Sequence, residues 1–298
     1  MNQPPPTAQP PPARPPDPDT RTPALKAPSG ACDTHCHVFG PAVRYPFAGV
    51  RRYTPPDCPI EDCLAMAGTV GLERAVLVQA SAHGTDNRVT LDAIARTGGR
   101  FRGVAIVDSS VSDGELERLH RGGMRGARMN TMGGGGVGIE HMDTLARRVS
   151  DLGWAIELHL RNADELVDLA PRLSALPGPC IIDHFGRVRG GQGVDNAGFQ
   201  ALLRLIRDDD KCWVKLASFY RLSDSGPPDY ADMTPIARAL IGARPDRLIW
   251  GSNWPHPSHQ GEMPNDDDLF DKLAEWAPEA EIRRQILVDN PTALFWAG

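Results

Sequence analysis

The sequence predicts an α/β fold and, within that class, a single-domain (β/α)8 TIM barrel. Eight short apolar runs alternate with amphipathic helical segments from Ala31 onward, which is the pattern of a parallel barrel. An open doubly wound sheet usually has fewer strands, and the chain lacks the Gly-x-Gly-x-x-Gly turn of a dinucleotide-binding sheet. Histidines and other polar residues gather where the runs end, the side on which a barrel has its mouth.

Each expected element follows from hydrophobic periodicity. The expected strands are Ala31–Phe39, Arg74–Ala80, Arg102–Val107, Gly126–Asn130, Ala155–Leu160, Cys180–His184, Cys212–Ala217 and Arg247–Gly251. The expected helices are Ile60–Val70, Asn87–Thr97, Asp113–Arg121, Ile139–Leu152, Ala163–Leu176, Asn196–Arg207, Asp229–Ile241, Asp266–Trp276 and Glu279–Val288. Asp86 and Asp113 precede or open two of these helices as plausible caps.

The first 28 residues differ in composition from the rest of the chain. Proline dominates residues 1–28, which contain almost no large apolar side chain. We therefore expect a disordered or extended polyproline tail outside the fold. Residues 29–298 remain for the barrel, close to the roughly 250 residues typical of one such domain.

Charge and composition exclude several classes of partner. The formal net charge is −6, and no run of Lys or Arg occurs, which argues against a nucleic-acid or anionic-membrane partner. No apolar stretch is long enough to span a bilayer, and no signal pattern opens the chain, so we expect a cytoplasmic protein. The six cysteines form no Cys-x-x-Cys pair and are interpreted as buried apolar residues.

The first expected strand carries two histidines, His35 and His37, one residue apart. Side chains alternate along a strand, so Asp33, His35 and His37 should point to the same face. Two imidazoles in one pocket can bind a divalent metal or polarise an oxygen atom through their N–H groups.

Polar residues also follow the other expected strands. These are Gln79, Ser81, His83, Arg128, Asn130, Glu157, His159, Arg161, Asp183, His184, Lys215, Ser218, Arg221, Asn253 and His256. Because the carboxyl ends of barrel strands meet at one mouth, this placement predicts a catalytic site. The glycine run Gly133–Gly136 lacks the Lys-Ser/Thr of a phosphate loop; we interpret it as a flexible loop that could act as a lid.

Several motifs resemble those of the amidohydrolase superfamily, in its amidohydrolase-related branch, with most likeness to lactone hydrolases of the 2-pyrone-4,6-dicarboxylate type. They are Asp-x-His-x-His at Asp33, Ile-Ile-Asp-His-Phe-Gly-Arg around His184, Trp-Gly-Ser-Asn-Trp-Pro-His near the C-terminus and the closing Asp-Asn-Pro-Thr-Ala-Leu-Phe-Trp. The resemblance extends from Gly30 to Gly298 and is specific to the branch, but not to one substrate.

The resemblance implies roles for individual residues. His35, His37 and His184 would polarise a scissile carbonyl without a metal, although other branch members hold Zn²⁺ or Mn²⁺ on the same set. Tyr53, Ser81, Arg128 and Arg221 match positions that bind substrate carboxylates, a task that suits the planar guanidinium. His83 and His256 are further candidates for substrate contact, His256 alternatively as a support for Asn253.

Three positions depart from the family pattern. Asn253 replaces the usual aspartate that deprotonates water, and an amide cannot act as a general base. The Gly133–Gly136 loop stands where a further arginine is expected, and His159 replaces a tyrosine. The base would then be His159, His184 or His256, and fewer cations imply a substrate with fewer acid groups than a dicarboxylate.

The resulting hypothesis is a hydrolase that opens a carboxylated lactone in aromatic or sugar-acid catabolism. Its partner would be a small-molecule carboxylated substrate, and no cofactor is required, with a single Zn or Mn ion on His35, His37 and His184 as the alternative. The other hypotheses are a sugar-lactone isomerase, a metal-dependent decarboxylase, or a catalytically silent ligand-binding relative. The sequence leaves open whether the chain forms a homo-oligomer.

Overall fold

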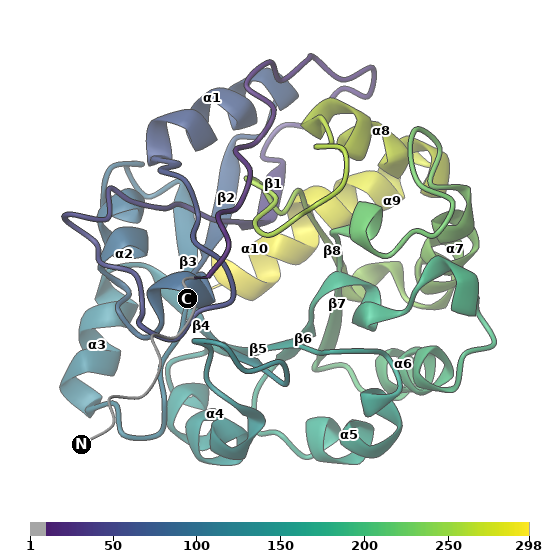
Figure 1. Cartoon of the computed structure of the whole chain (residues 1–298). Helices are drawn as coiled ribbons and strands as arrows, with labels where there is room; N and C mark the ends of the chain where they lie inside the picture. The colour runs from purple at the N-terminus through teal and green to yellow at the C-terminus, as the bar shows by residue number, and fades with distance from the viewer. Residues whose placement is uncertain (1–9, 298) are drawn as a thin grey trace, which may run out of the picture.

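The chain folds into one barrel of parallel strands with helices on its outside, and the predicted fold class is confirmed (Figure 1). A computed structural model describes residues 10–297. Its eight strands pair in sequence order, and every pairing in the sheet is parallel. Within the described part of the chain, no helix combines the length and apolar character needed to cross a bilayer.

All eight expected strands occur, most of them shorter than predicted. They are β1 (Cys32–Cys36), β2 (Arg74–Val78), β3 (Phe101–Ala105), β4 (Met124–Asn130), β5 (Ala155–His159), β6 (Cys180–Ile182), β7 (Cys212–Ala217) and β8 (Leu248–Gly251). The helices around them are α1 (Ile60–Val70), α2 (Arg88–Ala95), α3 (Asp113–Arg121), α4 (Met142–Ser150), α5 (Glu165–Ser174), α6 (Ala197–Asp208), α7 (Thr234–Ala243) and α8 (Asp266–Trp276).

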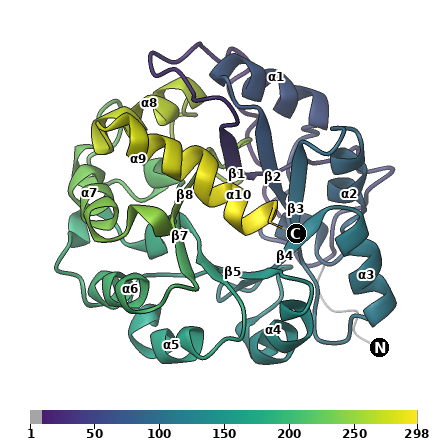
Figure 2. The same ribbon diagram turned by 180° about the vertical axis from the view of Figure 1, so that it is seen from behind.

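The C-terminal segment differs from the prediction of one helix at Glu279–Val288. It comprises α9 (Ala280–Arg284), a π-helical turn at Gln285–Asp289 and α10 (Asn290–Phe295). Seen from behind, this segment lies across one end of the barrel (Figure 2). The chain continues from α9 through the π-turn into α10 without a break, and α10 packs at the end of the barrel.

The barrel interior is apolar at the end covered by α10 and polar toward the other end. Leu294 and Phe295 of α10 pack with Trp213 and Ile249 from inside the barrel. Further along β7, the next inward side chain is Lys215, because side chains alternate between the two faces of a strand. The charged residues of the interior therefore lie between an apolar floor and the mouth.

Asp33 joins the first and last strands, where the ring closes. Its carboxylate accepts hydrogen bonds from the backbone N–H and the hydroxyl of Ser252, at 3.1 and 2.5 Å. It also accepts from the backbone N–H of His35 at 2.9 Å. Burial raises the pKa of Asp33 to about 6. Asp33 thus holds the backbone together at the β1–β8 junction and makes no hydrogen bond to an imidazole ring of the described residues.

Regular alternation along β1 does not hold, which corrects the expectation that Asp33 shares a face with both histidines. The pairing register with β2 shifts between Asp33 and Cys36. Cys32 packs in the interior cluster, whereas Cys36 packs in the outer one. His35 and His37 nevertheless come together, with ring centroids 4.9 Å apart.

Residues 10–28, here called the N-terminal strap, correct the prediction of a tail outside the fold. The backbone N–H of Ala13 donates to the carbonyl of Thr54, and that of Thr54 donates to the carbonyl of Pro11, both at 2.8 Å. The guanidinium of Arg14 donates to the carbonyl of Gly261 at 2.8 Å. Residues 1–9 of the predicted tail lie outside the described residues.

The second half of the strap is held at the start of α8. Arg21 forms ion pairs with Asp267 at 2.9 Å and with Asp268 at 2.5 Å. Asn265, just before the helix, donates to the Asp17 carboxylate at 3.0 Å. The strap is extended, as polyproline composition predicts, but its arginines and few backbone N–H groups attach it to the barrel.

Candidate active site

A cavity of about 80 Å³ lies at the mouth of the barrel, where the predicted site residues meet. Those that line it are His37, Tyr53, Ser81, Arg128, His159, His184, Arg221 and Asn253. Arg52, Met132, Pro257 and Ser258 complete its wall. Ligand cavities are commonly about 300–1,000 Å³, and the space between the side chains here is smaller than that range.

Beneath the cavity lies a buried ion cluster of Arg128, Glu157, Asp183 and Lys215, from four different strand ends. The ammonium of Lys215 is 2.5 Å from a Glu157 oxygen and 3.3 Å from an Asp183 oxygen. Arg128 lies 2.8 Å from Asp183 and 3.2 Å from Glu157. Two cations and two carboxylates balance one another where an unpaired charge would be costly.

The two carboxylates of the ion cluster differ in proton affinity. Burial and the charge of Asp183 raise the pKa of Glu157 to about 7. Burial alone would also raise the pKa of Asp183, but the charges of Lys215 and Arg128 hold it well below its usual value. Asp183 is therefore the permanent anion of the site.

His35 lies between the ion cluster and the cavity and is fully buried. Its Nδ1 is 3.0 Å from the ammonium of Lys215, which can only donate. Burial and Lys215 hold the pKa of His35 well below its usual value, so the ring is neutral. Nδ1 also lies 3.3 Å from an Asp183 oxygen, which can only accept, so the two neighbours of Nδ1 favour opposite tautomers. Nε2 has no hydrogen-bond partner among the described residues.

His37 and His159 are held in opposite tautomers. Nδ1 of His37 is 2.7 Å from the carbonyl of Val78, which can only accept, so this ring carries its proton on Nδ1. Nδ1 of His159 is 3.1 Å from the guanidinium of Arg128, which can only donate, so this ring carries its proton on Nε2. His37 thus offers a lone pair to the cavity, and His159 offers an N–H.

Both rings are neutral in the ordinary pH range. Burial and the nearby Arg128 lower the pKa of His37 to about 3. The same two causes hold the pKa of His159 well below its usual value. Their tautomers, rather than their charges, therefore decide what each ring can do.

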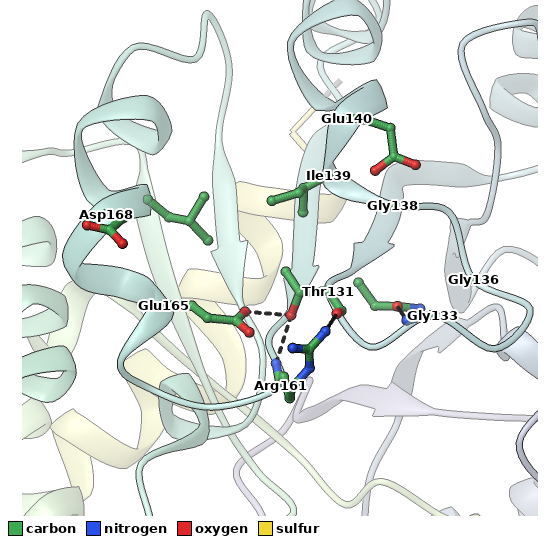
Figure 3. A pocket seen from close by; sticks show the side chains of 11 residues that line it. Thr131, Gly133, Gly136, Gly138, Ile139, Glu140, Arg161, Glu165 and Asp168 are labelled. Atoms are coloured by element: carbon green, nitrogen blue, oxygen red, sulfur yellow. Dashed lines mark hydrogen bonds between the residues drawn. The ribbon is translucent and has the colours of Figure 1, made fainter.

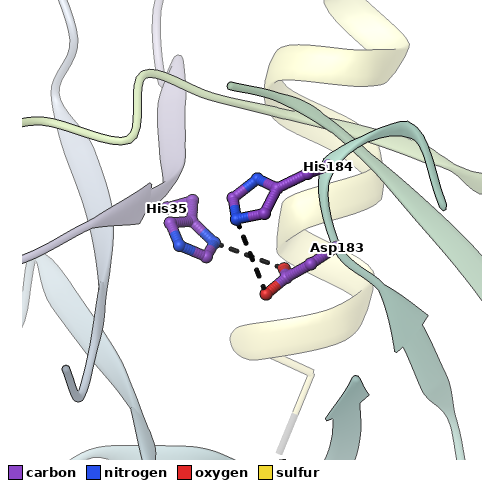
Figure 4. Close-up of side chains that lie close together, drawn as sticks. All are labelled: His35, Asp183 and His184. Carbon is purple, nitrogen blue, oxygen red and sulfur yellow. Dashed lines mark ion pairs between the residues drawn. The ribbon is translucent and has the colours of Figure 1, made fainter. Parts of the chain in front are cut away.

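His184 follows β6 and comes closest to a metal-binding geometry with His35 and Asp183. Figure 4 shows both imidazoles in contact with the Asp183 carboxylate, and one nitrogen or oxygen of each residue lies within 4.8 Å of the others. This group differs from the predicted set of His35, His37 and His184, because it contains Asp183 in place of His37. Nδ1 of His184 has no hydrogen-bond partner in residues 10–297.

The residues around this metal-type group do not fit a cation well. The ammonium of Lys215 already lies 3.0 Å from His35 Nδ1 and 3.3 Å from Asp183. The other oxygen of Asp183 is engaged by Arg128. A metal ion would bring a third cation to atoms that already contact two, and Asn253 is a poor ligand beside a carboxylate.

The arginines of the site fall into two kinds. Arg128 is neutralised by the ion cluster, whereas Arg221 contacts only the carbonyl of Pro257 at 3.3 Å and the hydroxyl of Ser258 at 3.1 Å. Arg52 and Arg187 form no ion pair with any residue between 10 and 297. Burial and the neighbouring Arg221 lower the pKa of Arg187 to about 10. These three cations lack a counter-ion in the described chain.

His83 and His256 are not among the residues that line the cavity, and their substrate contacts stay predictions. The ring of His83 packs on Phe39 and Phe47, with Nδ1 3.3 Å from the carbonyl of Pro46. His256 is fully buried behind the cavity wall, 3.0 Å from the hydroxyl of Tyr220. The alternative role, support for Asn253, is taken up below.

A larger hollow of about 550 Å³ opens beside the site, between the β4–α4 loop and α5 (Figure 3). Its polar groups pair with one another: Thr131 donates to Glu165 at 2.5 Å, and Arg161 donates to the Thr131 carbonyl at 2.6 Å. The Gly133–Gly136 loop forms one edge. A Cβ at Gly135 would lie 2.5 Å from the carbonyl oxygen of Ser81, so this loop packs closely against the segment between β2 and α2.

The family of the chain follows from comparison with known proteins. The amidohydrolase family model matches residues 32–296. The chain belongs to the amidohydrolase family. Among solved structures, the amidohydrolase fold described here superposes on the Agrobacterium tumefaciens protein ATU3138 with a TM-score of 0.84 and 31% identity, over 93% of this chain and 98% of that one.

Curated relatives of this amidohydrolase act on lactones, according to their names. It is 40% identical over 283 residues to a 2-pyrone-4,6-dicarboxylate hydrolase of Comamonas testosteroni, covering 92% of each chain. It is 41% identical over 273 residues to a 4-sulfomuconolactone hydrolase of Hydrogenophaga intermedia, covering 90% of this chain and 89% of the relative. A D-galactarolactone isomerase of Agrobacterium fabrum is 32% identical over 272 residues, covering 90% and 91%.

Some residues of this amidohydrolase site were not predicted from the sequence. Arg52 lines the cavity, and Arg187 lies close enough to Arg221 and Arg52 to be affected by their charges. Arg187 stands inside the motif around His184, and Arg52 directly precedes Tyr53. The sequence therefore shows where Arg52 and Arg187 lie relative to predicted site residues. It does not show that they lack a counter-ion within the described chain.

Replacing Lys215 tests the balance of the ion cluster. Lys215→Met leaves Glu157 and Asp183 with one cation, and should lower the free energy of unfolding by about 3–5 kcal/mol, as for a broken buried ion pair. Urea unfolding measures this loss. Adding Glu157→Gln should restore part of the stability, and Lys26→Met, at an exposed lysine, should change it by less than about 0.5 kcal/mol. Equal effects of the two lysine variants would contradict the argument.

Proposed function

We propose that this amidohydrolase opens a small lactone that carries an acid group, by hydrolysis of the ring ester. The observation that carries the proposal is the convergence of two kinds of group on one small cavity. Imidazole nitrogens with defined donor and acceptor roles line the cavity together with Arg52 and Arg221, which have no carboxylate partner in the described chain. The names of the lactone-hydrolysing relatives support the same substrate class.

The donor imidazoles would bind the carbonyl oxygen. Nε2–H of His159 faces the cavity. Nε2 of His35, which carries the ring proton when Nδ1 accepts from Lys215, lies beneath the cavity with no partner among the described residues. Hydrogen bonds from preorganised donors stabilise the negative charge that develops on this oxygen as water attacks the carbonyl carbon. His184, whose Nδ1 also lacks a partner there, is a third contact in this group.

His37 is reassigned from polarising the carbonyl to accepting a proton. Its Nδ1–H is committed to Val78, which leaves the Nε2 lone pair for the water. Asn253 would accept one water hydrogen on Oδ1 and orient the attack. The proton passes to His37 Nε2 as the new C–O bond forms, and then to the ring oxygen as the ester C–O bond breaks. A substrate anion beside Arg128 would offset the charge that depresses the pKa of His37.

Arg52, Arg187 and Arg221 would hold the acid group of the substrate. Arg187 and Arg221 are partly buried, Arg52 is exposed, and none of the three has a counter-ion in the described chain. Such cations favour a bound anion, most strongly where they are partly buried. Arg128 is less suited, because Asp183 and Glu157 already neutralise it. This division of the arginines refines the predicted clamp of Arg128 and Arg221, with Tyr53 and Ser81 on the same wall.

Lactone isomerisation is the second candidate, and the relative named as a lactone isomerase is the observation that favours it. In this reaction a hydroxyl of the substrate would attack the carbonyl in place of water and, like water, would pass its proton to a base such as His37. Isomerisation would use the same donors and the same arginines, so the two reactions differ in the nucleophile.

Oxygen-18 water distinguishes the candidates. We expect acid-bearing five- and six-membered lactones to give products with one labelled oxygen and one released proton per turnover, detected by mass spectrometry and pH-stat titration. An isomer without label would replace hydrolysis by isomerisation. Tight binding in calorimetry without any conversion would instead indicate a ligand-binding relative and overturn the proposal.

Arg221→Met tests the acid-binding side. Loss of a hydrogen bond to a charged group of about 1.5–3 kcal/mol predicts a roughly 10- to 100-fold rise in KM for an acid-bearing lactone. The methyl ester of the same lactone serves as the control, and its KM should be similar for wild type and variant. An equal change for both substrates would contradict an anion contact at Arg221.

The cations that surround Asp183 allow a prediction about metal dependence. Because Lys215 and Arg128 already engage this carboxylate, we propose that turnover needs no metal. Dialysis against a chelator should leave kcat/KM unchanged, and elemental analysis of the active protein should find less than stoichiometric Zn and Mn. Loss of activity that returns on addition of either ion would establish the metal-dependent alternative.

A further inference from the structure

Asn253 is held by a line of buried polar side chains that runs away from the cavity. Its amide nitrogen donates to the hydroxyl of Tyr220 at 2.8 Å. That hydroxyl lies 3.0 Å from Nδ1 of His256, whose Nε2 is 3.4 Å from a carboxylate oxygen of Asp266. These four residues, here called the amide relay, are each less than a tenth exposed.

The far end of the amide relay sets the direction of the two hydrogen bonds in it. The carboxylate of Asp266 lies 3.4 Å from His256 Nε2 without forming a hydrogen bond to it, and a carboxylate at this distance favours a proton on that nitrogen. Nδ1 of His256 is then the acceptor, and the hydroxyl hydrogen of Tyr220 must point toward it. The hydroxyl oxygen is left to accept, so residue 253 has to supply a donor.

We propose that the amide relay selects asparagine over aspartate at position 253 and aims the Asn253 carbonyl oxygen at the reacting water. Tyr220, His256 and Asp266 are positioning residues in this scheme, since none of them lines the cavity. Asn253 is thus the residue that its surroundings require, and not an inactivated aspartate.

Backbone hydrogen bonds hold residue 253 in place, so its side chain stays next to Tyr220. The N–H of Asn253 donates to the carbonyl of His35, and its own carbonyl accepts from the N–H of His256, both at 2.7 Å. Residue 253 has φ +65°, a left-handed conformation that Asn and Asp both tolerate. The backbone therefore does not discriminate between them, and the amide relay does.

An aspartate at position 253 would compete for the one proton of the Tyr220 hydroxyl. If Tyr220 donated to this new carboxylate, Nδ1 of His256 would lose its donor. If His256 reversed its tautomer to repair this, a lone pair would face the Asp266 carboxylate. Neutral asparagine at position 266 removes that conflict, because its amide can donate to the reversed imidazole.

A double-mutant cycle in urea at pH 8 tests the amide relay without any need for activity. Asn253→Asp should shift the folding equilibrium at least tenfold toward the unfolded state, and Asp266→Asn alone should have a smaller effect. In the double variant Asn253→Asp/Asp266→Asn, the donor and acceptor roles along the amide relay can all reverse. The double variant should therefore be more stable than Asn253→Asp. Additive effects would overturn the proposal.

Asp267→Asn is the matched control. It removes a negative charge from the same first turn of α8 without touching His256, so its combination with Asn253→Asp should be additive. If Asn253→Asp does not fold, folded protein from the Asp266→Asn double variant counts as the expected rescue. Failure of both to fold contradicts the amide relay.

A kinetic measurement, which rests on the proposed function, separates positioning from support of the fold. Tyr220→Phe should lower kcat of lactone turnover at least tenfold while KM changes less than twofold, because substrate contacts stay in place. An unchanged kcat would overturn the positioning role. If the double variant is rescued in urea but the wild type turns over no lactone, the amide relay is supported and the proposed function is rejected.

Discussion

Charge balance inside the barrel is the constraint on which the rest of the site depends. Lys215 and Arg128 meet Glu157 and Asp183 from different strands, at a level where the barrel is closed below by apolar side chains. Their arrangement gives His35 an ammonium neighbour and His159 a guanidinium neighbour. The His159 ring must then carry its proton on Nε2, and a His35 ring that accepts from Lys215 does the same, so the ion cluster influences the tautomers of the imidazoles above it.

The fold was predictable because its signals are local and repeated. Strand β7 and helices α1, α3 and α8 have the bounds that periodicity predicts, since each needs only its own sequence. The shift of the pairing register in β1 and the π-turn before α10 were not predictable, because contacts with distant residues decide them. The prediction for the strap was wrong for the same reason: composition says nothing about polar groups that lie more than two hundred residues away in the chain.

The site was predictable as a set of residues and less so as a set of roles. Strand ends brought His37, His159 and His184 into one cavity. Their tautomers depend on the carbonyl of Val78 and the guanidinium of Arg128, which no spacing rule reveals. His256 illustrates the limit, because its motif places it near Asn253, but only the hydroxyl of Tyr220 shows how the two are connected.

The N-terminal strap has a practical consequence for handling the protein. It touches Thr54, next to Tyr53 of the cavity wall, and Gly261, three residues after Ser258 of the same wall. Trimming the proline-rich residues to aid crystallisation would therefore remove contacts from two loops that shape the cavity. The last described residues lie at the opposite end of the barrel (Figure 2), so an affinity tag disturbs the mouth least when it is fused there.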